Sequence, residues 1–221
     1  MVNSLGESVL VLVVDTSTPA VTAALVQVEA DAVRVLAEKS TVDARAHGEL
    51  LAPAVAEVLS ATKPDEVRAI VAGLGPGPFT GLRVGLVTAS VFGQTLGIPT
   101  YGVCSLDGIG AATTGATLVA TDARRKEVYW AAYRDGVRTD GPHVDRPGEV
   151  SLDGFDSAAG AGAHQYALAL PLLDLFYPSP LALVRAAADR IRDGAPSEKL
   201  TPLYLRRPDA VEPGSPKAVL R

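Results

Sequence analysis

The densest group of residues that could do chemistry is a glycine-rich loop between a short apolar strand and a segment almost free of charge. The loop spans Gly73 to Gly85 and reads GLGPGPFTGLRVG. Glycine lets another backbone or a ligand approach closely, and the N–H groups of a helix's first turn attract anions. Gly75, Gly77 and Thr80 are therefore candidate phosphate contacts, with Thr80 as a predicted N-cap. The alternative is a rigid strand-to-helix connection that binds no ligand.

The loop matches neither of the two common nucleotide-binding motifs. A Walker loop requires Lys and then Ser or Thr after its last glycine, but Leu82 and Arg83 follow Gly81 here. The dinucleotide fingerprint requires three glycines at fixed offsets, and Pro78 or Thr80 occupies the third position in the two available frames. The sequence therefore predicts neither a P-loop nor a Rossmann dinucleotide site.

Charge is distributed so that any contact with nucleic acid must be local. The chain of 221 residues carries a net charge of −5, which excludes a basic field over the whole domain. Two short basic segments remain as candidate contacts with RNA or with an acidic partner: the turn Arg124, Arg125, Lys126, and Arg206 with Arg207 near the carboxyl end.

The compartment can be predicted from the cysteine content and from the first residues. Cys104 is the single cysteine, which excludes an intramolecular disulfide and is consistent with a reducing compartment. Residues 1–8 contain no basic region, and the apolar run 9–14 is too short for a signal peptide or a membrane span. We expect a soluble cytoplasmic protein without a membrane partner.

The pattern of apolar residues predicts a mixed α/β protein with mixed sheets flanked by helices. The predicted strands cover 9–14, 21–28, 32–38 and 69–72, and the predicted helices cover 47–61, 81–96 and 181–192. A second strand–turn–strand unit at 118–133 resembles the first one, which indicates a faint internal duplication, although chance similarity of two hairpins explains it equally well. We expect an N-terminal lobe at 1–100, a smaller lobe at 101–200 and a proline-rich basic tail at 201–221, with loops around short strands at 134–162.

Two predicted helices carry a candidate partner interface. Gly85, Ala89 and Gly93 recur every four residues on a helix that has no charge after Arg83, so they form a flat strip that a partner helix could approach. The helix at 47–61 has a broad apolar stripe of its own that includes Leu51 and Val55. We expect both helices to contribute to a subunit interface.

Five blocks in order along the chain resemble the TsaB/YeaZ family of bacterial tRNA threonylcarbamoyladenosine biosynthesis proteins. They are DTS at 15–17, the glycine loop at 73–85, YGVCSLD at 101–107, DARRKEVY at 122–129 and PLYLR at 202–206. The resemblance covers about residues 9–207, and the glycine loop and the block at 122–129 are its specific parts. It implies two related lobes of the actin-like ATPase superfamily, which is RNase H-like (ASKHA), and this would explain the duplication.

In such a fold, Asp15 and Asp122 would end strands where nucleotide phosphates and a metal ion bind. Asp15, Thr16 and Ser17 are then candidates for a degenerate phosphate loop together with Gly75, Gly77 and Thr80. The competing role, which we favour, is turn formation through side-chain hydrogen bonds to nearby N–H groups.

The resemblance also implies a departure from the catalytic relative, TsaD. TsaD-like proteins carry a His-x-Glu-Gly-His motif whose two histidines bind a metal ion, and here Ser105 and Ile109 occupy those two positions. A neutral hydroxyl is a poor metal ligand and Ile has no donor atom. We therefore expect no metal and no catalytic residue in this chain.

The function implied by the resemblance is that of a non-catalytic scaffold or activator subunit. The complex would add threonylcarbamoyl to N6 of the adenosine next to the tRNA anticodon. The implied partners are a TsaD-like catalytic subunit, a TsaE-like ATPase and, through the complex, tRNA. The chain alone would form a homodimer and bind no cofactor tightly, while ATP or ADP could bind at the complex interface. The alternative is a self-sufficient ATPase or an acyl or phosphoryl transferase of the actin-like superfamily; a peptidase is disfavoured by the missing histidines.

Overall fold

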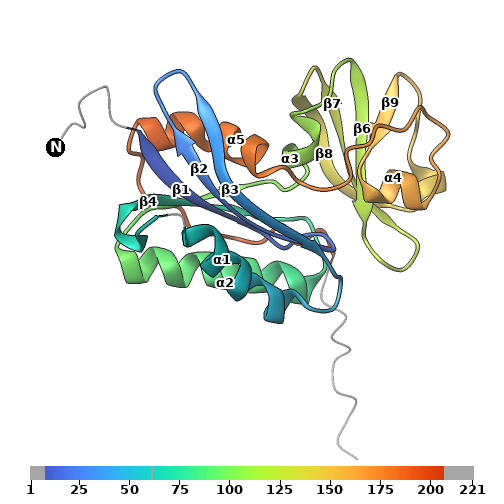
Figure 1. Ribbon diagram of the computed structural model, residues 1–221. Helices are drawn as coiled ribbons and strands as arrows, with labels where there is room; N and C mark the ends of the chain where they lie inside the picture. Colours follow the sequence, from blue (N-terminus) through green and yellow to red (C-terminus); the bar gives the residue numbers. More distant parts are fainter. Residues whose placement is uncertain (1–7, 61, 207–221) are drawn as a thin grey trace, which may run out of the picture.

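The first lobe is built on a five-stranded mixed sheet (Figure 1). The computed structural model describes residues 8–60 and 62–206. The strand order is β3-β2-β1-β4-β5, with β1–β2 and β2–β3 antiparallel and β1–β4 and β4–β5 parallel. The strands are β1 (Val9–Asp15), β2 (Ala20–Val28), β3 (Val33–Val42), β4 (Val67–Gly73) and β5 (Thr100–Val103).

Helices cover both faces of this sheet, which explains why β1 is apolar along its whole length. Helices α1 (His47–Leu59) and α2 (Phe79–Leu96) cover one face, and α5 (Pro180–Arg192) covers the other (Figure 1). Alternate residues of β1 enter the two cores: Leu12 and Val14 pack with α1 and α2, whereas Val11 and Val13 pack with α5.

The second lobe repeats this arrangement on a smaller scale. Its four-stranded sheet has the order β8-β7-β6-β9, with β6–β7 and β7–β8 antiparallel and β6–β9 parallel. The first four strands of the chain show the same order and directions, so the predicted duplication is confirmed. The elements of the second lobe are α3 (Asp107–Gly110), β6 (Ala116–Asp122), β7 (Val128–Arg134), β8 (Val137–Asp145), the 3₁₀ helix η2 (Pro147–Glu149), β9 (Ser157–Ala159) and α4 (Ala161–Gln165), while the 3₁₀ helix η1 (Pro64–Glu66) precedes β4 in the first lobe.

The division at residue 100 does not coincide with the boundary between the two sheets. Strand β5 and helix α5 lie at 100–103 and 180–192, yet both belong to the first sheet and its cores. Residues 194–206, the C-terminal strap, also return to the first lobe, where the N–H of Leu203 donates to Leu74 O at 2.8 Å. The first lobe is therefore not one continuous stretch of sequence, because the chain leaves the first lobe after β5 and returns to it with α5 and the strap.

The structure also differs from the sequence-based predictions in where several helices and strands begin or end. Helix α2 begins at Phe79 with Pro78 as its N-cap, so the prediction of Thr80 as N-cap was wrong. Helix α1 ends at Leu59 instead of 61, and the segment 134–162, predicted as loops around short strands, contains the nine-residue strand β8. Arg207 and the rest of the predicted tail after it lie outside the described residues.

The predicted interface strip on α2 faces the sheet instead of a partner. A Cβ added at Gly85 would lie 2.5 Å from Thr16 Oγ1, one added at Gly93 would lie 2.6 Å from Thr100 Cγ2, and Ala89 is fully buried. On α1, the predicted contacts Leu51 and Val55 are buried in the same core. Small residues on α2 therefore serve close packing of the helix on β4 and β5 within one chain.

The middle of the outer face of α2 nevertheless exposes two apolar side chains. Val87 and Val91, one turn apart, are 60% and 52% exposed. Beside it, α1 exposes small side chains at Ala52 and Ala56. Within the described part of the chain, no helix is long and apolar enough to span a bilayer.

Candidate functional site

The carboxyl end of β1 and the glycine loop are packed directly against each other. The hydroxyl of Ser105 donates to Asp15 Oδ2 at 2.6 Å, and the hydroxyl and N–H of Ser17 donate to Asp15 Oδ1 at 2.8 and 3.1 Å. Ser105 Oγ in turn accepts the N–H of Gly75 at 3.1 Å. Burial raises the pKa of the Asp15 carboxyl, and the hydrogen bonds from Ser105 and Ser17 oppose that rise.

The neighbouring contacts leave the loop filled by the protein's own atoms. Thr16 Oγ1 donates to Gly81 O at 2.7 Å and accepts the N–H of Gly85 at 3.0 Å. A Cβ added at Gly77 would lie 2.2 Å from Ser17 O. The first turn after β1 thus makes the close approach to the glycines that a phosphate group would otherwise make.

Asp15→Asn tests the electrostatics of this buried cluster. Because the folded pKa is raised above the ordinary value of 3.8, the contribution of Asp15 to stability is greatest at low pH and falls as pH rises through the folded pKa. We expect the stability of the wild type relative to Asp15→Asn to increase as pH is lowered from about 7 to about 4. Urea unfolding at several pH values in this range measures the difference in the free energy of unfolding between the two proteins. Asp193→Asn, at an exposed position, is the control. A difference between wild type and Asp15→Asn that does not change with pH would contradict the prediction.

The two positions aligned with metal-ligating histidines have structural roles. Ser105 is buried and bonded to Asp15, and Ile109 is buried in the core of the second lobe. Cys104 beside them is also buried, which raises the pKa of its thiol to about 11 and keeps it protonated at neutral pH. Among residues 8–60 and 62–206 no group of three or more His, Cys, Asp or Glu side chains is placed to hold a metal ion.

An interlobe cavity of about 290 Å³ lies at the start of α2. It is lined by residues of the turn after β1, the loop before α1, the start of α2 and the turn after β6: Thr18, Pro19, Ala44, Arg45, His47, Gly48, Pro78, Phe79, Thr80, Gly81, Val84, Asp122 and Arg124. Pro78 provides no side-chain cap for α2, so no side chain caps the N–H groups of its first turn here. The cavity thus brings together the predicted residues Thr80, Asp122 and Arg124 with Arg45, which sequence reasoning missed.

The basic turn beside this cavity has an unusual backbone. Arg124, Arg125 and Lys126 all adopt left-handed conformations, with φ of 62°, 55° and 62°. Such a conformation costs roughly 1–2 kcal/mol for each residue that is not glycine. Asp122 Oδ1 accepts the N–H of Arg124 at 3.0 Å, and the end of the strap holds the turn as well, since Arg206 donates to Arg124 O at 3.3 Å and pairs with Glu127.

The strap also meets the start of α2 in an exposed aromatic–arginine stack. The rings of Phe79 and Tyr204 lie 5.2 Å apart at 25°, and Arg83 Cζ lies 3.7 Å from the Phe79 centroid. Arg83 Nε donates to the hydroxyl of Tyr204 at 2.8 Å. Side chains of two segments far apart in the sequence are thereby fixed beside the interlobe cavity.

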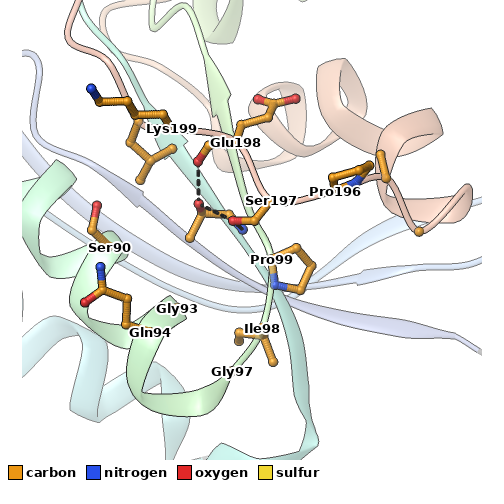
Figure 2. Close-up of a pocket in the computed structure, with 14 residues that line it drawn as sticks. Ser90, Gly93, Gln94, Gly97, Ile98, Pro99, Pro196, Ser197, Glu198 and Lys199 are labelled. Carbon is orange, nitrogen blue, oxygen red and sulfur yellow. Dashed lines mark hydrogen bonds between the residues drawn. The ribbon is translucent and has the colours of Figure 1, made fainter.

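A larger hollow of about 770 Å³ lies at the other end of α2, between that helix and the strap (Figure 2). Several of its polar groups are paired with one another. Ser197 Oγ accepts the N–H of Thr100 at 3.0 Å, and the hydroxyl of Thr100 donates to Glu198 O at 2.9 Å. The contacts shown in Figure 2 therefore hold the strap against β5.

Two mycobacterial relatives match about nine tenths of this chain, and a relative from Escherichia coli matches less than half of it. An uncharacterized protein of Mycobacterium tuberculosis is 53% identical over 202 residues, which cover 90% of this chain and 93% of that protein. An uncharacterized protein of Mycobacterium leprae is 51% identical over 203 residues, 91% of this chain but only 56% of that protein's length. The tRNA threonylcarbamoyladenosine biosynthesis protein TsaB of Escherichia coli is 37% identical over 97 residues, 41% of this chain and 42% of that protein.

A comparison with solved structures and a match to a family model support the same relationship. YeaZ from Pseudomonas aeruginosa superposes with a TM-score of 0.72 at 25% identity, covering 89% of this chain and all of that one. The profile of the family described as TsaD, tRNA N6-adenosine threonylcarbamoyltransferase, matches residues 34–187. The chain therefore belongs to the TsaD family and, within it, to the TsaB/YeaZ proteins.

Proposed function

We propose that this chain is a non-catalytic subunit that activates a TsaD-like enzyme, which adds threonylcarbamoyl to N6 of the adenosine next to the tRNA anticodon. The names of the Escherichia coli and Bacillus subtilis relatives support the pathway. The observation that carries the non-catalytic role is the Asp15 cluster. The carboxylate at the end of β1 is buried and bonded to Ser105, the residue that stands where a TsaD-like protein has a metal-binding histidine.

The partner surface in this proposal is the outer face of α2, around Val87 and Val91. Two exposed valines on successive turns, beside small exposed side chains of α1, form an apolar face that a second helical surface can cover. The TsaD-like subunit is the proposed occupant in the complex, and a second copy of this chain takes its place in a homodimer when the chain is alone. A TsaE-like ATPase completes the machinery.

Contacts with tRNA are proposed to lie beside the interlobe cavity. ATP or ADP would bind at the interface with the partner and only in the complex, since the loops after β1 and β4 of this chain are filled by each other. The residues proposed to face tRNA are those of the basic turn and the end of the strap: Arg124, Arg125, Lys126 and Arg206.

The proposal is tested by reconstitution from separate subunits with tRNA. Threonylcarbamoylation is expected from the TsaD-like and TsaE-like subunits together with this chain, and not when this chain is omitted. Full activity of the partners without this chain would contradict the proposal. Modification or ATP turnover by this chain alone would instead support a self-sufficient enzyme of the actin-like superfamily.

A further inference from the structure

An exposed aromatic pair stands at the rim of the interlobe cavity. Phe79 and Tyr204 are 46% and 41% exposed although both are large rings, and each lies next to the guanidinium of Arg83. Arg83 holds the Tyr204 hydroxyl and stacks on Phe79, so both rings are fixed in orientation. Rigid, solvent-facing rings beside cationic groups are the usual platform on which proteins stack unpaired bases.

Two arginines supply positive charge next to this platform. Arg45 lines the cavity, and within the described part of the chain its guanidinium makes no ion pair or hydrogen bond. Arg124 also lines the cavity and is half exposed, and its Nε lies 3.7 Å from Asp122 Oδ2. Asp122 offsets part of the Arg124 charge, and His47 is bonded to Thr18 O at 2.8 Å, so Arg45 is the cation most available to an anion.

We infer that the aromatic stack and the interlobe cavity form one binding site for an unpaired RNA nucleotide. The base stacks on the Phe79–Tyr204 pair, and the phosphate lies between Arg45 and Arg124. The volume of about 290 Å³ suits a single nucleotide unit better than a longer stretch. This assignment rests on the proposed role in tRNA modification, because it names the part of the tRNA that this chain contacts.

The strap gives the site its geometry. Tyr204 stacks on the first residue of α2, while Arg206, two residues later, bonds to Arg124 O. The same short segment therefore sets the spacing between the stacking surface and the basic turn. A loop nucleotide can meet both groups at once, whereas a base within a duplex has no free face to stack.

The test measures binding of a short fluorescein-labelled single-stranded RNA to the complex of this chain with its TsaD-like subunit, by anisotropy over a salt series. Tyr204→Leu removes the ring and is expected to weaken binding roughly 10-fold to 100-fold. Tyr204→Phe keeps the ring, loses only the bond to Arg83, and is expected to change affinity by less than about 3-fold. Arg45→Ala is expected to lower the salt slope by about 0.7, and Arg34→Ala on β3 serves as the matched charge control.

Several outcomes separate this inference from the proposed function. Wild-type affinity in Tyr204→Leu, equal effects of Arg45→Ala and Arg34→Ala, or equal affinity for the same RNA in a duplex would overturn the site even if the complex still requires this chain. Binding of ADP with no saturable binding of the RNA would overturn it as well. Thermal unfolding of each variant establishes that it is folded, and tRNA modification without this chain would count against the function itself.

Discussion

Replacing Val91 with aspartate is expected to weaken the association of this chain with the TsaD-like subunit strongly while leaving the chain folded. Val91 is half exposed on α2, so a carboxylate there remains in water in the free protein. In the complex the carboxylate would be buried without a partner. The combined loss of apolar contact and burial of a charge is expected to weaken association about 100-fold or more. Sedimentation or light scattering of the mixed subunits measures it.

A matched variant separates the partner surface from general effects of a new charge. Val137 on β8 is 68% exposed in the second lobe. Val137→Asp therefore makes the same chemical change away from α2 and is expected to leave association unchanged. Equal loss of association in the two variants, or full association of Val91→Asp, would contradict the placement of the interface on α2.

Gly77→Ala is expected to destabilise the chain severely. The added Cβ would lie 2.2 Å from the backbone oxygen of Ser17, and a backbone atom in a packed turn cannot move aside as a flexible side chain does. We expect a loss of about 3 kcal/mol or more in the free energy of unfolding. For a chain of this size that corresponds to a fall in Tm of roughly 6–12 °C.

Gly48→Ala is the control for this substitution. Gly48 lies in the first turn of α1, and a Cβ added there has no atom within 4 Å. Alanine favours the helix, so this variant is expected to be as stable as the wild type or more stable by about 0.5–1 kcal/mol. If Gly77→Ala were equally well tolerated, the loop would not be filled by the turn after β1, and it would be open to a phosphate as the sequence alone allowed.

The predicted fold class and the order of elements were obtained from periodicity, because strands buried on both faces and amphipathic helices leave clear patterns. Periodicity could not predict whether the small residues of α2 face the sheet of the same chain or a partner subunit. Gly85 and Gly93 allow close approach to a helix of another subunit as well as to a sheet of the same chain, and only the fold shows that Thr16 and Thr100 occupy that space.

The site was predicted only in part for a related reason. The turn at Arg124 and the loop at Thr80 stand out by composition, and the structure brings them together. Arg45 lies in a segment with no distinguishing pattern, and Tyr204, although it belongs to the block at 202–206, is far in sequence from the loop that it contacts. Tyr204 reaches the site because the strap returns to the first lobe, and Arg45 reaches it because the loop before α1 lines the interlobe cavity.

The central claim, activation without catalysis, is tested most directly by titrating this chain into a fixed amount of TsaD-like subunit with TsaE-like subunit and tRNA. The initial rate of threonylcarbamoylation is expected to rise from near zero and to saturate. Val91→Asp is expected to require a much higher concentration for half-maximal rate but to approach the same maximum, since it alters association and not chemistry. A rate independent of this chain, or a rate that persists when the TsaD-like subunit is omitted, would contradict the account.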